Sequence, residues 1–174
     1  LQEISLDFDC ITETSEALHT LNSNQASSLK IIKLHFGTAE FNPQALGAAY
    51  ETLRLQTDLQ ELVIVCEELS EALSSELSKL LVASTPKKKL EIFVNKVLVS
   101  QDSTKFLPKA HMQLQVLEEF TFKIKCGQHQ FDRENLTGLI DFLSTTKGLK
   151  KLCLQLNEMS SSLLDLCTVI AEQI

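Results

Sequence analysis

Six short segments of the chain share one spacing of apolar residues. In each, an apolar residue is followed by two more, two and four positions later, and the segments begin at intervals of 28, 30, 28, 30 and 32 residues. Such alternation is typical of a β-strand with one buried face. The triplets are Ile4, Leu6, Phe8; Ile32, Leu34, Phe36; Leu62, Ile64, Cys66; Leu90, Ile92, Val94; Phe120, Phe122, Ile124; and Leu152, Leu154, Leu156.

The position three residues before each triplet extends this framework. It holds Leu1, Leu29, Leu59, Lys87, Leu117 or Leu149. Of the 24 framework positions 23 are apolar, although the 44% of hydrophobic residues predicts only about 11, and this fixed period indicates a repeat array. The exception, Lys87, is predicted to lie at the surface end of its strand, because a buried unpaired ammonium is costly.

Segments with helical periodicity follow the strands. Behind the third strand, apolar residues recur at helical spacing at Leu69, Leu73, Leu77, Leu80 and Leu81. The start and stop signals of the helices are Asn42-Pro43, Ser70 before Glu71, Asp132, Pro86 and Gly148. Pro108 predicts that the fourth helix begins late or is kinked.

A strand and a helix within about 30 residues cannot bury both apolar faces alone. Successive units therefore stack, with parallel strands centred near residues 5, 33, 63, 91, 121 and 153. Strands pack about 4.8 Å apart whereas helices need about 10 Å, so the stack bends with the sheet on the inside. We expect an α/β fold, a curved solenoid with the parallel sheet on its concave face and helices on its convex face.

We assign the chain to a single domain of six repeats, at 1–28, 29–58, 59–86, 87–116, 117–148 and 149–174. Residue 1 is already a framework leucine, and residue 174 ends an apolar helical stretch. Repeat arrays end in polar capping repeats. We therefore expect this chain to be a segment of a longer array.

The charge and the cysteine content indicate which classes of partner and which cellular compartment fit this chain. A net charge of -7 and a pI near 5.1 argue against general nucleic-acid binding, which needs a dense basic stripe. Five cysteines, odd in number and without a CxxC pair, fit the reduced thiols of a cytoplasmic protein, with the nucleus as the alternative. No apolar run is long enough to predict a membrane span.

The framework resembles the LxxLxL core of leucine-rich repeats over the whole chain. That core stands at Leu1-x-x-Ile4-x-Leu6, Leu29-x-x-Ile32-x-Leu34, Leu59-x-x-Leu62-x-Ile64, Leu117-x-x-Phe120-x-Phe122 and Leu149-x-x-Leu152-x-Leu154. The period and the helical segments are similar to the ribonuclease-inhibitor-like subclass, which includes the sensor arms of NOD-like receptors, Ran GTPase activators and some F-box proteins. The resemblance implies a horseshoe that binds proteins.

The chain departs from this family three residues after LxxLxL, where the family carries an asparagine ladder. Asparagine stands there at Asn95 and Asn157, but Asp9, Gly37, Glu67 and Lys125 replace it elsewhere. The family's ladder is therefore mostly missing, and we read the chain as a divergent member.

Residues between the framework positions point to the opposite face of the sheet, because side chains alternate along a strand. Their first row is Glu3, Ile31, Glu61, Lys89, Glu119, Lys151, and the last four alternate in charge, which favours correct stacking. The second row is Ser5, Lys33, Val63, Glu91, Thr121, Cys153, and the third is Asp7, His35, Val65, Phe93, Lys123, Gln155. Asp7 and His35 take equivalent places on neighbouring strands, so they can form a surface ion pair or a pH switch.

An apolar centre within a charged rim is typical of an interaction site. The predicted partner-binding residues are Lys33, His35, Val63, Val65, Glu91, Phe93, Thr121 and Lys123. The alternative is that β-branched residues merely suit strands and that another part of the full-length protein covers them.

Catalytic and metal sites find little support in the sequence. Cys153 and His35 lie on strands four apart, about 19 Å at 4.8 Å per strand, too far for a nucleophile and its base. No HExxH, clustered Cys/His spacing or glycine-rich phosphate loop is present, so we predict no enzyme, cofactor or metal.

Recognition of a protein partner on the sheet face, within a larger sensor, receptor or scaffold protein, is therefore the predicted function. Two alternatives stay open: a regulator of a small GTPase, disfavoured because Arg54 and Arg133 are the only arginines, and a structural segment of a large assembly.

Overall fold

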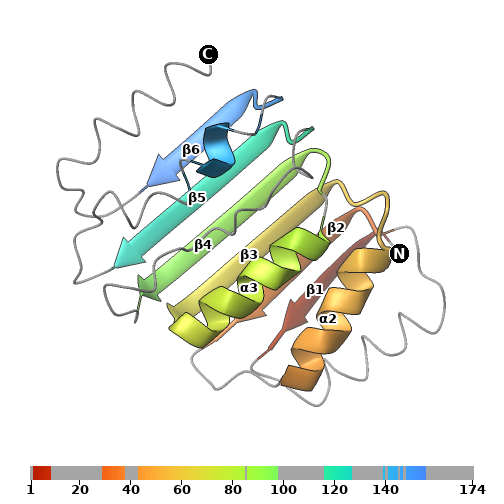
Figure 1. The fold of residues 1–174 in the computed structure, drawn as a ribbon, viewed down its shortest axis with the longest axis vertical. Coiled ribbons are helices and arrows are strands. Elements are labelled where there is room, and N and C mark those ends of the chain that lie inside the picture. The colour runs from red at the N-terminus through yellow and green to blue at the C-terminus, as the bar shows by residue number, and fades with distance from the viewer. Residues whose placement is uncertain are drawn as a thin grey trace.

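One six-stranded sheet organises the protein (Figure 1). The computed structural model describes residues 2–8, 29–37, 43–84, 86–97, 116–126, 139, 141–144, 146 and 148–155. The strands are β1 (Glu3–Asp7), β2 (Ile31–Phe36), β3 (Glu61–Leu69), β4 (Lys89–Val97), β5 (Glu119–Cys126) and β6 (Lys151–Gln155). They lie in chain order and every neighbouring pair is parallel. The predicted parallel α/β architecture and its six strands are confirmed.

The register of the sheet aligns equivalent framework positions. Leu6 pairs with Leu34, Ile64 with Ile92, and the series continues across the sheet in the same way. A slip of one residue would turn each strand's apolar side chains to the other face. The alternation of apolar residues in the sequence and the pairing of strands in space therefore specify the same register.

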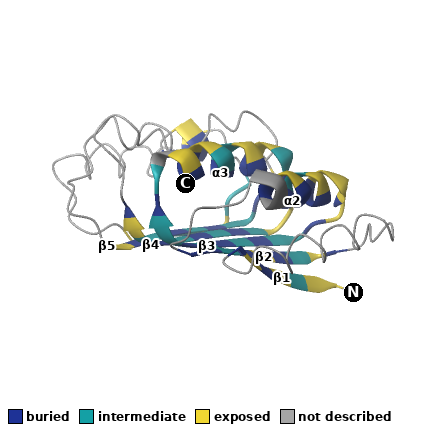
Figure 2. Cartoon of the chain, turned by 90° about the horizontal axis from the view of Figure 1, so that it is seen from below, coloured by how far each residue is buried: buried dark blue, intermediate teal, exposed yellow. Residues whose placement is uncertain are grey.

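Among the described residues, the helices α2 (Pro43–Leu55) and α3 (Glu71–Ala83) cover one face of the sheet, and Figure 2 shows both on the same side. The framework residues of the strands point toward them into one continuous core, which includes Leu34, Ile64 and Phe120. Short helical turns at residues 141–144 add Phe142 to this core. Its ring tilts against Phe120 with centroids 4.6 Å apart.

The helix ends agree with their sequence signals where the structure describes them. Pro43 is the first residue of α2, and Ser70 caps α3, accepting a hydrogen bond from the backbone N–H of Leu73 at 3.2 Å. Leu69 corrects the sequence interpretation, because it ends β3 and is fully buried instead of opening the helix. The signals at Asn42, Pro108 and Asp132 lie outside the described residues.

Lys87 lies at the surface as predicted. Its side chain is 46% exposed, and its ammonium is 2.9 Å from the carboxylate of Asp58. Its backbone N–H donates to the carbonyl of Leu59, so the chain keeps the repeat geometry while the charge stays in water. No helix among the residues that the structure describes is long and apolar enough to cross a membrane.

Removing the α3 cap should destabilise the protein by about 1 kcal/mol. Ser70→Ala leaves the N–H of Leu73 without its side-chain acceptor. Ser78→Ala in the same helix is the matched control. The Ser78 hydroxyl donates a hydrogen bond to the carbonyl of Ser74 within the helix, and alanine is favoured in a helix interior. Urea unfolding should separate the two variants, and equal losses of stability would contradict the capping role.

Candidate functional site

The face of the sheet opposite α2 and α3, which we call the open face, carries the three predicted rows of side chains. Strand register places Lys33, Val63, Glu91 and Thr121 in one row and Asp7, His35, Val65, Phe93 and Lys123 in the next. All eight predicted partner-binding residues therefore lie on one surface formed by four adjacent strands, β2 to β5. Whether they bind a partner stays a prediction.

Val63, Val65 and Phe93 form an apolar island at the centre of that face. Val65 pairs directly with Phe93, and Val63 lies on the same strand two residues earlier. Each of the three residues is half-buried. The ammonium of Lys123 lies 5.9 Å from the centre of the Phe93 ring, within range of a cation–π contact.

Ion pairs surround the island. Lys33 contacts Glu3 at 2.6 Å, and Lys151 contacts Glu119 at 3.5 Å. Lys89 differs from the predicted ladder, because its closest carboxylate belongs to Glu91 on its own strand, at 3.0 Å. The hydrogen bond to Glu91 raises the pKa of Lys89 against the opposing effect of burial.

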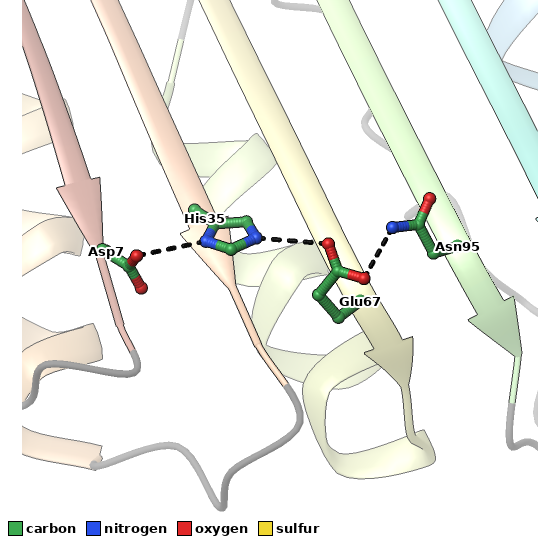
Figure 3. Close-up of polar contacts among 4 residues, drawn as sticks. All are labelled: Asp7, His35, Glu67 and Asn95. Carbon is green, nitrogen blue, oxygen red and sulfur yellow. Dashed lines mark hydrogen bonds and ion pairs between the residues drawn. The ribbon is translucent and has the colours of Figure 1, made fainter.

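A chain of polar contacts crosses the other side of the island from β1 to β4 (Figure 3). His35 Nδ1 lies 3.3 Å from Asp7, as the sequence pairing predicted, and its Nε2 lies 3.4 Å from Glu67. Asn95 Nδ2 donates to the other oxygen of Glu67 at 2.6 Å. His35 therefore lies between two carboxylates, and one of them is held in place by an amide.

The ionisation of this chain follows from its geometry. Partial burial on its own lowers the pKa of His35, but the hydrogen bonds and charges of Asp7 and Glu67 outweigh it, and the net pKa is raised. The hydrogen bond from Asn95, followed by that from His35, lowers the pKa of Glu67. Both shifts favour an imidazolium next to a carboxylate.

Glu67 and Asn95 were not among the predicted site residues. Both occupy the position of the expected asparagine ladder, where the sequence keeps the asparagine at Asn95 and replaces it at Glu67. A signal was nevertheless present, because equivalent repeat positions become neighbours in space. Glu67 and Asn95 stand 28 residues apart and meet side by side.

The His35 cluster should make stability depend on pH in a defined window. A raised histidine pKa contributes stability below the ordinary histidine pKa, and this is lost as pH rises through the raised value. The lowered pKa of Glu67 contributes stability above the ordinary glutamate pKa, and this is lost on acidification. The combined contribution of His35 and Glu67 to the stability of the fold is therefore greatest between about pH 4.5 and 6.5.

Thermal melts of wild type and His35→Gln between pH 5 and 8 test this linkage. As pH rises, the melting temperature of wild type should fall more than that of the variant, because only wild type loses the His35 charge. The imidazole resonance of His35 is assigned in proton NMR as the one that is missing from His35→Gln. Its pKa should lie above that of free histidine. Titration at or below the free value would contradict the coupling to Asp7 and Glu67.

Cys66 and Cys153, the cysteines whose side chains the structure describes, lie on different strands. Burial raises the pKa of the Cys66 thiol to about 12, so it acts as a core residue. Cys153 lies on β6 and His35 on β2, four strands apart as predicted. Within the described ranges, no group of three or more His, Cys, Asp or Glu side chains is arranged to hold a metal ion.

No protein-family model matches this chain, and no curated protein matches it in sequence.

Proposed function

We propose that the protein is a leucine-rich-repeat solenoid whose open sheet face binds a protein partner. Support for the solenoid comes from the parallel strands in chain order, the aligned framework residues and the two helices on one side. Spacing differences between strands and helices bend such a stack toward its sheet, which makes the open face concave.

The observation that carries the binding role is the apolar island within its ring of charges. Val63, Val65 and Phe93 keep part of their surface in water, although the strand alternation places a fully apolar core directly behind them. A central apolar cluster with a polar rim is the composition of interfaces in which a few residues supply most of the affinity. Recognition, without chemistry on the partner, is the activity that this surface supports.

The alternative function, regulation of a small GTPase, gains no support from the arginines of this chain. Arg54 lies on α2 and is paired with Glu51 through two hydrogen bonds, at 2.9 and 3.1 Å. Arg133 lies outside the described residues. The same island would also suit a structural segment whose apolar face is permanently covered.

Affinity capture from native cell extract tests the proposal. The tagged chain is compared with Phe93→Ala and with the double variant Val63→Ser, Val65→Ser. Val82→Ser is the matched control, because Val82 is a 50% exposed apolar residue on α3, on the other side of the sheet. Proteins lost with both island variants and kept by the control would support the binding face, whereas undiminished recovery by the folded island variants would overturn it.

A further inference from the structure

Lys123 differs from the other lysines near the island. Lys33, Lys89 and Lys151 each lie within 3.5 Å of a carboxylate. For Lys123, the contact found in the described part of the chain is the ring of Phe93, and no carboxylate there reaches ion-pair distance. Its ammonium therefore lies at the edge of the apolar island without a carboxylate partner among the described residues.

Charge is distributed unevenly along the strands that carry the island. Near the start of the strands, the carboxylates of Glu61, Glu91 and Glu119 all act on the ammonium of Lys89, and Glu119 also lies 3.5 Å from Lys151. Toward the end of β5, Lys123 is followed two residues later by Lys125, which is exposed. The island thus has an excess of carboxylates over ammonium groups at the strand starts and two lysines on β5.

From this polarity we infer that the partner is a protein segment in which an acidic residue stands next to an apolar residue. The inference rests on the proposed binding function of the open face. The apolar side chain would cover Val63, Val65 and Phe93, while its neighbouring carboxylate meets the ammonium of Lys123.

Electrostatics favours this partner over a neutral or basic one. A partner that covers Phe93 removes water from the adjacent ammonium of Lys123, and an uncompensated charge in an interface is unfavourable. A carboxylate supplies the compensation. At the strand starts, the three carboxylates around Lys89 would repel an acidic side chain, so the same polarity sets the direction in which the segment lies.

Selection from a random dodecapeptide library displayed on phage, with the full chain immobilised, tests this partner chemistry. The variant is Lys123→Gln, which removes the charge and keeps most of the side chain. Lys79→Gln is the matched control, because Lys79 lies on α3, on the other side of the sheet, and its charge is compensated by Glu76 at 2.6 Å. Phe93→Ala reports separately on binding to the island.

The expected result is enrichment of peptides that place Asp or Glu next to an aliphatic or aromatic residue. A synthetic peptide of the enriched sequence should bind Lys123→Gln about three- to tenfold more weakly than wild type or Lys79→Gln, with a smaller dependence on salt. Fluorescence anisotropy at low and high salt measures both.

Three other outcomes would overturn the inference. Enrichment that depends on Phe93 but selects neutral or basic neighbours would refute the acidic partner and leave the binding face intact. An acidic peptide whose affinity is unchanged in Lys123→Gln would do the same. Enrichment independent of Phe93, or none above the bare support, would refute the binding face as well.

Discussion

Phe120→Ala should lower the free energy of unfolding by about 3 to 5 kcal/mol. The Phe120 side chain is fully buried, stacks with Phe122 and tilts against Phe142. Truncation removes its transfer free energy and leaves a cavity between the sheet and its covering layer, which a parallel sheet closes only in part. Guanidinium unfolding followed by circular dichroism measures the loss, and an unchanged denaturant slope would attribute it to the folded state.

Phe93→Ala is the matched control, because Phe93 lies on the neighbouring strand and on the opposite face. Its half-buried ring should contribute far less to stability than Phe120. The pair therefore tests which face of the sheet is core. A loss at Phe93 equal to that at Phe120 would mean that the assignment of the two faces is wrong.

Phe93→Ala should instead have its large effect on binding. Burial of an aromatic anchor at the centre of an interface commonly contributes about 2 kcal/mol or more to binding. Its removal then raises the dissociation constant roughly 30-fold. Surface plasmon resonance with a partner recovered by capture should show most of this effect in the dissociation rate.

Lys33→Ala provides the contrast for that measurement. Lys33 is paired with Glu3 and lies at the rim, so its loss should alter mainly the association rate and its dependence on salt. An equal loss of affinity in Phe93→Ala and Lys33→Ala would contradict an apolar centre with a charged rim.

The strands and their register could be predicted from the sequence because the same buried apolar residues determine both. A period of two with one apolar face specifies which residues of a strand are buried, and its recurrence every 28 to 32 residues specifies which residues of successive strands become neighbours. The rows that place Val65 beside Phe93 follow directly from this.

The ends of the elements and the polar partners could not be predicted in the same way. Alternation along β3 breaks after Cys66, so Leu69 turns inward while still in the strand, although its spacing also suits a helix face. Lys89 could reach carboxylates on its own or on neighbouring strands, and the choice of Glu91 depends on side-chain geometry that periodicity does not encode. For His35, repeat alignment indicated Asp7, while Glu67 reaches it from the next row along the strand direction.

Site-specific photo-crosslinking tests the central claim most directly. Thr121→p-benzoylphenylalanine places the probe on β5 beside Glu91 and next to the apolar island, whereas Val82→p-benzoylphenylalanine places it on α3. If the open face binds the partner, irradiation in cell extract should join a protein to the probe at position 121 and not at position 82, and Phe93→Ala should reduce that product. A product at position 82 with none at position 121 would place the binding surface on the helices and contradict the account.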